Sequence, residues 1–369
     1  MGGWLDIVAG IEALEPAGLD PALVRAFEAL HRPAGAVNFY VPTFKSYATS
    51  EIAACGKSAW PAVSITGPEC KLQCDHCKAK LLEPMIPATT PEALWRVVNE
   101  QIAAGAQGML LTGGSNHRDE VEYDAFFPTV RRIKDEFPGF RIAIHTALVD
   151  RDKAERIAAS GVDAAMLDII GAQDTVQQVY HLKRPVADFE SSLEHLVDTG
   201  MKVVPHIVLG LHYGRMLGEW NALEMIARRK PSALVLVVVM PFYAPGHRAF
   251  ETISSAEVGR FFLDARAALP DTPLLLGCAR PPGRAKMEID AYAVMAGMNG
   301  LAHPSDGCVE LAVALGDDVR VTPSCCSIAV GEEVLALDGG TVSVDADVYL
   351  RARREQPVRR GVGIPVVAA

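Results

Sequence analysis

The sequence lacks the features that mark secreted, membrane-spanning or nucleic-acid-binding proteins. No run approaches the roughly 18 apolar residues of a transmembrane helix. The first residues contain no basic segment followed by an apolar core, so we expect no signal peptide and a cytoplasmic protein. The 35 basic residues are outnumbered by 45 acidic ones, which argues against a nucleic-acid or anionic-membrane surface. The eight cysteines are then expected to stay reduced, as ligands or buried apolar side chains.

Short apolar runs are what the sequence has instead, and amphipathic segments lie between nearly every pair of them. The runs predict eight strands, at residues 62–66, 108–112, 141–146, 164–169, 202–209, 233–240, 273–277 and 298–303. Strands that alternate with helices indicate a parallel sheet with right-handed crossovers, and eight strands close a barrel. We therefore predict an α/β fold, a complete or partial (β/α)8 TIM-type barrel.

The chain outside these runs divides into a flank and an extension. Residues 1–60 are expected to form an N-terminal flank with two helices and an extended segment at 37–42. The barrel is predicted over residues 61–303. Residues 304–369 form a C-terminal extension with short strands expected at 319–321 and 341–344.

Three cysteines follow the first predicted strand directly: Cys70, Cys74 and Cys77, at spacing C-x3-C-x2-C. In a parallel barrel the loops after the strand ends form the active site, so these thiols are expected on that face. Thiolates held this closely bind an iron–sulfur cluster, and three ligands leave one iron open. A structural zinc site is the alternative, but it needs a second pair, and no other C-x2-C occurs.

The stretch 64–77 resembles the signature of the radical S-adenosylmethionine (SAM) enzymes, and the resemblance extends over roughly residues 60–303. It implies that the three cysteines hold a [4Fe–4S] cluster whose fourth iron is chelated by SAM. One electron from the cluster then breaks the sulfonium to give a 5′-deoxyadenosyl radical, which abstracts a hydrogen atom. The resemblance also implies a ferredoxin or flavodoxin as reductant. His76 stands where this family usually has an aromatic residue.

Further resemblances imply which residues bind SAM. Gly113, Gly114 and Ser115 resemble the Gly-Gly-Glu motif that binds the SAM amino group, with serine in place of the glutamate. Asp168 resembles the acidic residue that holds the SAM ribose, although a capping or salt-bridging role is equally open. Ile207 and Gly210 loosely resemble the adenine-contacting segment. Three histidines at strand ends either face the cavity or are structural: His145, His206 and His212.

The loop after the seventh predicted strand, residues 278–281, resembles that of the biotin synthase-like enzymes. The resemblance implies a catalytic role for Arg280, which corresponds to a ligand of an auxiliary cluster in biotin synthase. The matching cysteines of that enzyme are absent here, so we expect Arg280 to contact a carboxylate instead.

Four late cysteines are candidates for a second iron–sulfur cluster or for buried packing: Cys278, Cys308, Cys325 and Cys326. With a second cluster, the chain looks most like a radical SAM subunit of the two-component lipoyl synthases. That resemblance implies sulfur insertion into a protein-bound octanoyl chain, with a second radical SAM subunit and a lipoyl-carrier protein as partners. Segment 240–245 would then form an apolar wall. A mutase or metal-cofactor maturase without sulfur insertion, and a non-catalytic iron–sulfur or zinc protein, are the alternatives.

Overall fold

The computed structural model describes residues 3–30, 32, 35–41, 48–52, 60–240, 250–325, 328 and 342–355. Its strands form one sheet: β1 Ala36–Tyr40, β2 Ala62–Ser64, β3 Ile86–Pro87, β4 Gly108–Thr112, β5 Arg141–His145, β6 Ala164–Asp168, β7 Lys202–Leu209, β8 Leu234–Val238, β9 Leu274–Leu276, β10 Gly300–Ala302, β11 Asp318–Thr322 and β12 Val342–Ser343. The strand order is β12-β11-β1-β10-β9-β8-β7-β6-β5-β4-β2-β3. The first eleven strands pair in parallel, and β12 is antiparallel to β11.

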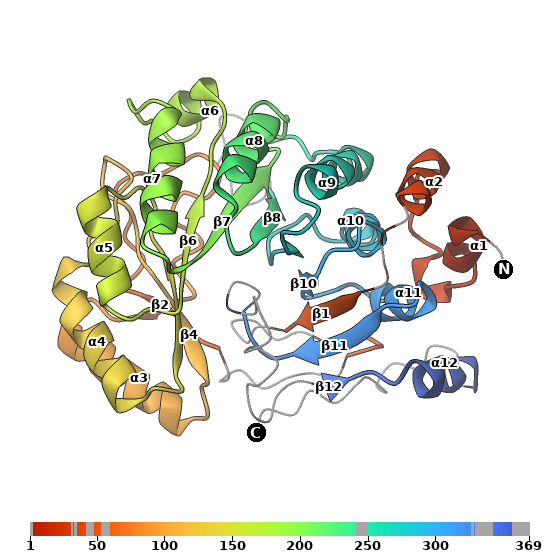
Figure 1. The fold of residues 1–369 in the computed structure, drawn as a ribbon, viewed down its shortest axis with the longest axis horizontal. Helices are drawn as coiled ribbons and strands as arrows, with labels where there is room; N and C mark the ends of the chain where they lie inside the picture. The colour runs from red at the N-terminus through yellow and green to blue at the C-terminus, as the bar shows by residue number, and fades with distance from the viewer. Residues whose placement is uncertain are drawn as a thin grey trace.

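The eight predicted strands are confirmed as β2 and β4 to β10. The curled sheet is a half-barrel with helices around its outer side (Figure 1). Its order is open, with β3 and β12 at the edges, so the partial form of the predicted barrel is the correct one. The flank and the extension both enter the sheet, because β1 lies between β10 and β11.

Helices connect the strands: α1 Trp4–Ala9, η1 Glu12–Leu14, α2 Pro21–Ala29, α3 Pro91–Ala103, η2 Asp124–Phe126, α4 Phe127–Glu136, α5 Arg151–Ala159, α6 Gln173–Gln178, α7 Ala187–Asp198, α8 Glu219–Arg229, α9 Ser255–Ala268, α10 Arg284–Met295, α11 Cys308–Ala314 and α12 Ala346–Glu355. The start of α3 has a local cause: the Thr90 side chain accepts a hydrogen bond from the Ala93 amide, and proline fills the first position. None of the described helices is long and apolar enough to cross a membrane.

Side chains along each strand point alternately to the two faces of the sheet. They form an outer apolar layer, which the helices cover, and an inner apolar layer inside the half-barrel. The inner layer joins apolar side chains of successive strands: Tyr40, Ala143, Ala164, Met166, Val204, Val235, Leu275 and Ala302. Two residues further along β5, β6 and β7, the inward side chains become polar: His145, Asp168 and His206. The inside of the half-barrel is therefore filled by the apolar inner layer. At the carboxyl ends of these strands, His145, Asp168 and His206 cover this layer and form what we call the polar floor of the cavity.

Candidate active site

The cysteine loop, residues 65–85, leaves the end of β2 and returns to β3. Hydroxyl groups brace its first turn: Ser64 donates to the Gly67 carbonyl at 2.7 Å, and Thr66 donates to the Glu69 carbonyl at 2.8 Å. The Lys71 amide donates to the Ser115 carbonyl at 2.9 Å, which ties the loop to the segment after β4. These bonds stabilise the backbone on both sides of Cys70.

Asp75 holds the middle of the loop against two other strand-end segments. Its carboxylate accepts from Lys78 Nζ at 2.7 Å and Tyr213 OH at 2.8 Å, and it lies 2.9 Å from His181 Nε2. Burial alone would raise the pKa of Asp75, but these partners lower it to about 2. The Asp75 amide also donates to the Val179 carbonyl. The charged group between Cys74 and Cys77 is therefore an anchor that fixes the loop over the barrel.

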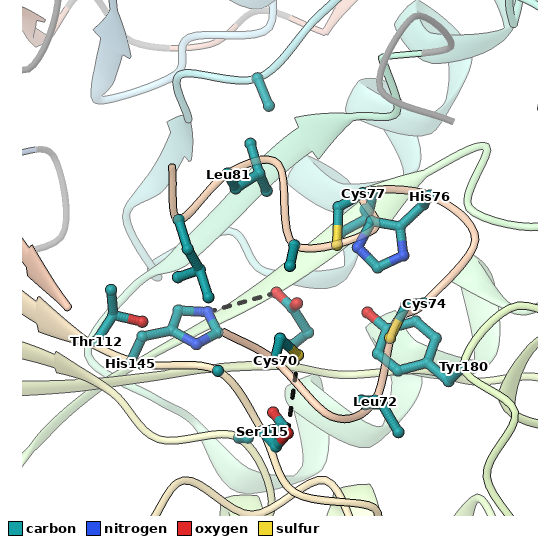
Figure 2. A pocket seen from close by; sticks show the side chains of 18 of the residues that line it. Cys70, Leu72, Cys74, His76, Cys77, Leu81, Thr112, Ser115, His145 and Tyr180 are labelled. Atoms are coloured by element: carbon teal, nitrogen blue, oxygen red, sulfur yellow. Dashed lines mark hydrogen bonds and ion pairs between the residues drawn. The ribbon is translucent and has the colours of Figure 1, made fainter. Parts of the chain in front are cut away.

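The three cysteines line one cavity of about 310 Å³ at the carboxyl ends of the strands. Figure 2 shows Cys70, Cys74 and Cys77 on one loop, with His145 and Thr112 of the sheet across the pocket. Cys74 is buried, and the other two are partly exposed to the cavity. The structure thus places the three thiols together at the carboxyl ends of the strands.

The thiols perturb one another. Burial raises the pKa of Cys74 well above its ordinary value, and the neighbouring Cys77 and Cys70 add to that shift. For Cys77, the adjacent His76 outweighs burial and lowers the pKa. A metal that replaces the protons would remove the repulsion among three closely spaced thiolates.

Two polar atoms in the same cavity are buried and lack a partner among the described residues: His76 Nδ1 and Tyr180 OH. Their rings lie 5.2 Å apart between centroids. A buried polar group without a hydrogen bond costs free energy, so these atoms fit a site that is completed by a ligand. The residues present therefore fit a thiolate-bound cluster with a polar cofactor beside it.

Gly113, Gly114 and Ser115 follow β4 and line the same cavity as the cysteines, and their contact with SAM stays a prediction. The Gly114 amide donates to Thr66 Oγ1 at 2.7 Å, and the Cys70 thiol lies 3.7 Å from the Ser115 carbonyl. Asp119 was not predicted, because it lies in a turn with no strand-end signal. It is buried in the same cavity, and burial raises its pKa to about 6 despite a hydrogen bond with Ser115.

Gly114→Ala is expected to reduce the iron bound per chain, because an added Cβ would lie 2.0 Å from the Glu69 carbonyl oxygen and 2.7 Å from Cys70 Cβ. Those contacts would push the cysteine loop away from the strand end. Gly139→Ala is the matched control, since nothing lies within 4 Å of the added Cβ there. Iron analysis after anaerobic reconstitution measures the effect. Equal iron in the two variants would contradict the close packing as a requirement for the site.

Asp168 and His145 line the cavity at the ends of β6 and β5, with His145 Nε2 3.7 Å from Asp168 Oδ1. Burial opposes ionisation of Asp168, but His145 and His206 outweigh it and lower the pKa to about 2. His206 has its pKa lowered to about 4 by burial and by His145. His212 lies elsewhere, with Nδ1 3.2 Å from the Thr175 hydroxyl.

The prediction that Ile207 contacts SAM is wrong, because its side chain lies on the face of the strand opposite the cavity. Ile207 belongs to the outer layer under the helices, whereas Val208 of the same strand lines the cavity. Successive side chains on a strand point to opposite faces, so a shift of one residue moves the contact to the other side. Gly210 does not line the cavity either. Its positive φ of 75° makes the turn after β7, and its amide donates to the buried Glu219 carboxylate at 3.0 Å.

Arg280 does contact a carboxylate, but it is one of the protein's own. Its guanidinium pairs with Asp290 of α10, and both side chains are fully buried. It also donates to the Gly277, Ala302 and His303 carbonyls at 2.6 to 2.9 Å. The catalytic role expected for Arg280 is therefore replaced by a structural one, which joins the ends of β9 and β10 to α10.

The late cysteines belong to different apolar clusters. Cys278 and Cys325 pack against the inner apolar layer of the half-barrel. Cys308 begins α11 in the larger apolar core, fully buried, with its thiol 3.3 Å from the Ser305 hydroxyl. Cys326 lies outside the described residues. Of the four predicted ligands of a second cluster, Cys308 is thus placed apart from Cys278 and Cys325.

The remaining lining of the cavity is largely aliphatic. The cysteine loop contributes one wall, and the ends of β7 and β8 contribute the other: Leu72, Leu81, Leu82, Met85, Val208, Val237, Val238, Val239 and Met240. Leu81 is 41% exposed, so the apolar wall reaches the surface. Met240 is the one residue of the predicted wall 240–245 that the structure describes. The chemistry of this lining matches an apolar ligand.

Comparison with known proteins supports the family suggested by the cysteine spacing. Residues 64–217 match the sequence profile described as the Radical SAM superfamily. The fold is similar to the crystal structure of HydG, a maturase of the [FeFe]-hydrogenase, with a TM-score of 0.56 and 13% identity over 90% of this chain and 79% of that one. Methylornithine synthase (PylB) gives a TM-score of 0.49 and 15% identity over 82% and 87% of the two chains. No curated protein sequence matches closely enough to count as a relative.

Proposed function

We propose that this chain, which contains a radical SAM superfamily domain at residues 64–217, is an enzyme that cleaves SAM reductively and inserts sulfur into an apolar acyl chain. The observation that carries the proposal is the cavity itself. It has three thiols on one side, a polar floor below and an aliphatic wall that reaches the surface. A polar cofactor and an apolar substrate both find matching chemistry there.

The cysteine loop supplies the ligands. Cys70, Cys74 and Cys77 would hold a [4Fe–4S] cluster, and the backbone of Gly113 to Ser115, beside Cys70, would contact SAM. When bound, these groups supply an electron and a 5′-deoxyadenosyl radical that abstracts hydrogen, and a second cluster would supply sulfur. His76 and Tyr180 provide the buried polar atoms that a cofactor would satisfy.

The aliphatic walls orient the substrate and exclude water from the reacting carbon. Leu81, Leu82 and Met85 face the Val237 to Met240 segment across the cavity, which suits a saturated hydrocarbon chain better than a charged metabolite. We infer a protein-bound octanoyl group as the substrate, because the wall opens to solvent at Leu81. A lipoyl-carrier protein would present it, and a second radical SAM subunit would take part in the sulfur insertion.

Cys278 and Cys325 are the ligands we propose for the second cluster, together with Cys326. Cys278 and Cys325 both pack against the inner layer of the half-barrel, and Ala279, next to Cys278, lines the cavity that would hold the substrate. Cys308 is left out of this set because it is fully buried, with its thiol beside the Ser305 hydroxyl. Ferredoxin or flavodoxin remains the proposed reductant.

Anaerobic reconstitution with counting of iron and sulfide tests this function. About eight irons per chain are expected from two [4Fe–4S] clusters, and about four would remove the sulfur-insertion step while leaving SAM cleavage. With SAM and a low-potential reductant, the protein is expected to release 5′-deoxyadenosine. Mass spectrometry of an octanoyl-carrier protein incubated with the enzyme then measures sulfur gain. Absence of 5′-deoxyadenosine from fully loaded protein would overturn the proposal as a whole.

A further inference from the structure

The polar floor of the half-barrel brings together two imidazoles and a carboxylate from three neighbouring strands. His145 ends β5, Asp168 ends β6, and His206 lies in β7, paired in register with Asp168. Each side chain offers one ligand atom, and these atoms all lie within 4.8 Å of one another. Three donors this close, from adjacent strands of a rigid sheet, form a preorganised set.

Hydrogen bonding fixes the orientation of one imidazole. His206 Nδ1 lies 3.0 Å from the Val204 carbonyl oxygen. A carbonyl only accepts, so Nδ1 carries the hydrogen and Nε2 is left with a free lone pair. Metal-binding histidines are typically held this way, with the second ring nitrogen donating to a backbone carbonyl.

His145 and Asp168 form a loose ion pair, and His206 lies beside them. His145 Nε2 is 3.7 Å from the Asp168 oxygen, longer than an N–H···O hydrogen bond, and the two histidine rings meet edge to face at 5.8 Å. Among the described residues, no side chain completes the hydrogen bonding of His206 Nε2. The donor atoms of the three groups therefore lie close enough together for one cation to bind all three.

The space between the three donor atoms is closed by apolar side chains on the side of the inner layer and is open on the side of the cavity. The inner residues just before them on the same strands are Ala143, Met166 and Val204, all buried and apolar. On the cavity side, the His145 and Asp168 side chains keep 30% and 29% of their surface exposed. A site with three protein ligands and one open face is the form in which an ion also binds an exogenous ligand.

We propose that His145, Asp168 and His206 bind one divalent first-row metal ion, such as Fe²⁺, Mn²⁺ or Zn²⁺, separate from the thiolate cluster. The donor set of two imidazoles and one carboxylate suits these ions. A carboxylate has two oxygens, so Asp168 can ligate the ion and still accept a hydrogen bond from a ligand in the cavity. The open coordination positions face the cavity and would take an oxygen or nitrogen donor of that ligand.

Manganese binding to the full-length, cluster-loaded protein tests the site without SAM or reductant, so a failure of SAM cleavage does not affect the result. After removal of loosely bound metal with a chelator, Mn²⁺ is titrated and its free signal is followed by electron paramagnetic resonance. One ion per chain is expected, with ¹⁴N coupling from imidazole in the pulsed spectrum. His206→Gln is expected to weaken binding by about tenfold or more. His117→Gln, at an exposed turn residue, is the control and should bind as the wild type does.

A wild-type protein that binds no stoichiometric Mn²⁺, or binds it without ¹⁴N coupling, would overturn the proposal. Equal affinity of His206→Gln and the wild type would do the same. If His206→Gln does not fold, Asp168→Asn replaces it, because the amide keeps the size of the carboxylate while removing its charge. The ¹⁴N coupling of the wild type decides the question independently of either variant.

Discussion

Cys74→Ala is expected to abolish iron binding at the first cluster and, with it, the release of 5′-deoxyadenosine from SAM. Cys74 is the most buried of the three loop thiols and lies between the other two in sequence. Its removal leaves two ligands for a cluster that needs three, and no other thiol of the loop replaces it. We expect SAM cleavage to fall by at least ~100-fold, since even the loss of a residue that only orients a ligand costs up to that much. Iron analysis, visible absorption and product chromatography measure the change.

Cys308→Ala is the matched control for this prediction. Cys308 is also a buried cysteine, and burial raises the pKa of its thiol, but it packs beside Ser305 and does not line the cysteine cavity. Its substitution is expected to leave iron content and SAM cleavage close to wild type. If Cys308→Ala lost iron, Cys308 would again be a candidate ligand of a second cluster. Full iron in Cys74→Ala would contradict the assignment of the loop.

The strands of the half-barrel were predictable because each is a short apolar run buried on both faces, between amphipathic segments. What the sequence did not reveal is where the distant pieces join. Residues 37–42 indicated only an extended segment, yet β1 pairs with β10 and β11, more than 250 residues away in the chain. Pairing over such a separation depends on the closure of the whole fold, so no local pattern indicates it. The extent of the sheet therefore required the structure.

The residues of the candidate site also divide into those that a local sequence pattern predicts and those that only the fold brings together. The three cysteines lie close together in the sequence, and so do the residues of the loop after β4, so both features were predicted. Ile207 failed because strand parity decides which face a residue meets, and a loose motif does not fix parity to one residue. The prediction of a catalytic Arg280 failed because Arg280 pairs with Asp290. Asp290 lies on the helix that follows the turn after β9, and the sequence does not show that this turn brings the two side chains together. Asp119 and Tyr180 reach the cavity from turns, for which no periodic signal exists.

Asp290→Ala is expected to lower the free energy of unfolding by about 3–5 kcal/mol, because it leaves the buried Arg280 guanidinium without its counter-charge. Both side chains are fully buried, and Asp290 also accepts from Lys286 Nζ at 2.6 Å and from the Ser305 amide at 2.7 Å. Burial opposes ionisation of Asp290, but Arg280 and Lys286 lower its pKa, so the carboxylate is charged in the folded protein. Urea unfolding followed by circular dichroism measures the loss.

Asp135→Ala supplies the comparison for that value, since Asp135 pairs with Arg131 on the surface of α4 and is 56% exposed. An exposed pair of this kind contributes less than ~1 kcal/mol. Replacing both buried partners, with Arg280→Met and Asp290→Leu together, is expected to recover much of the stability lost in Asp290→Ala, because no uncompensated guanidinium remains. A folded Asp290→Ala protein should bind iron as the wild type does, because the pair lies outside the cysteine cavity. If Asp290→Ala cost no more than Asp135→Ala, Arg280 would have to find another partner, and its structural assignment would be wrong.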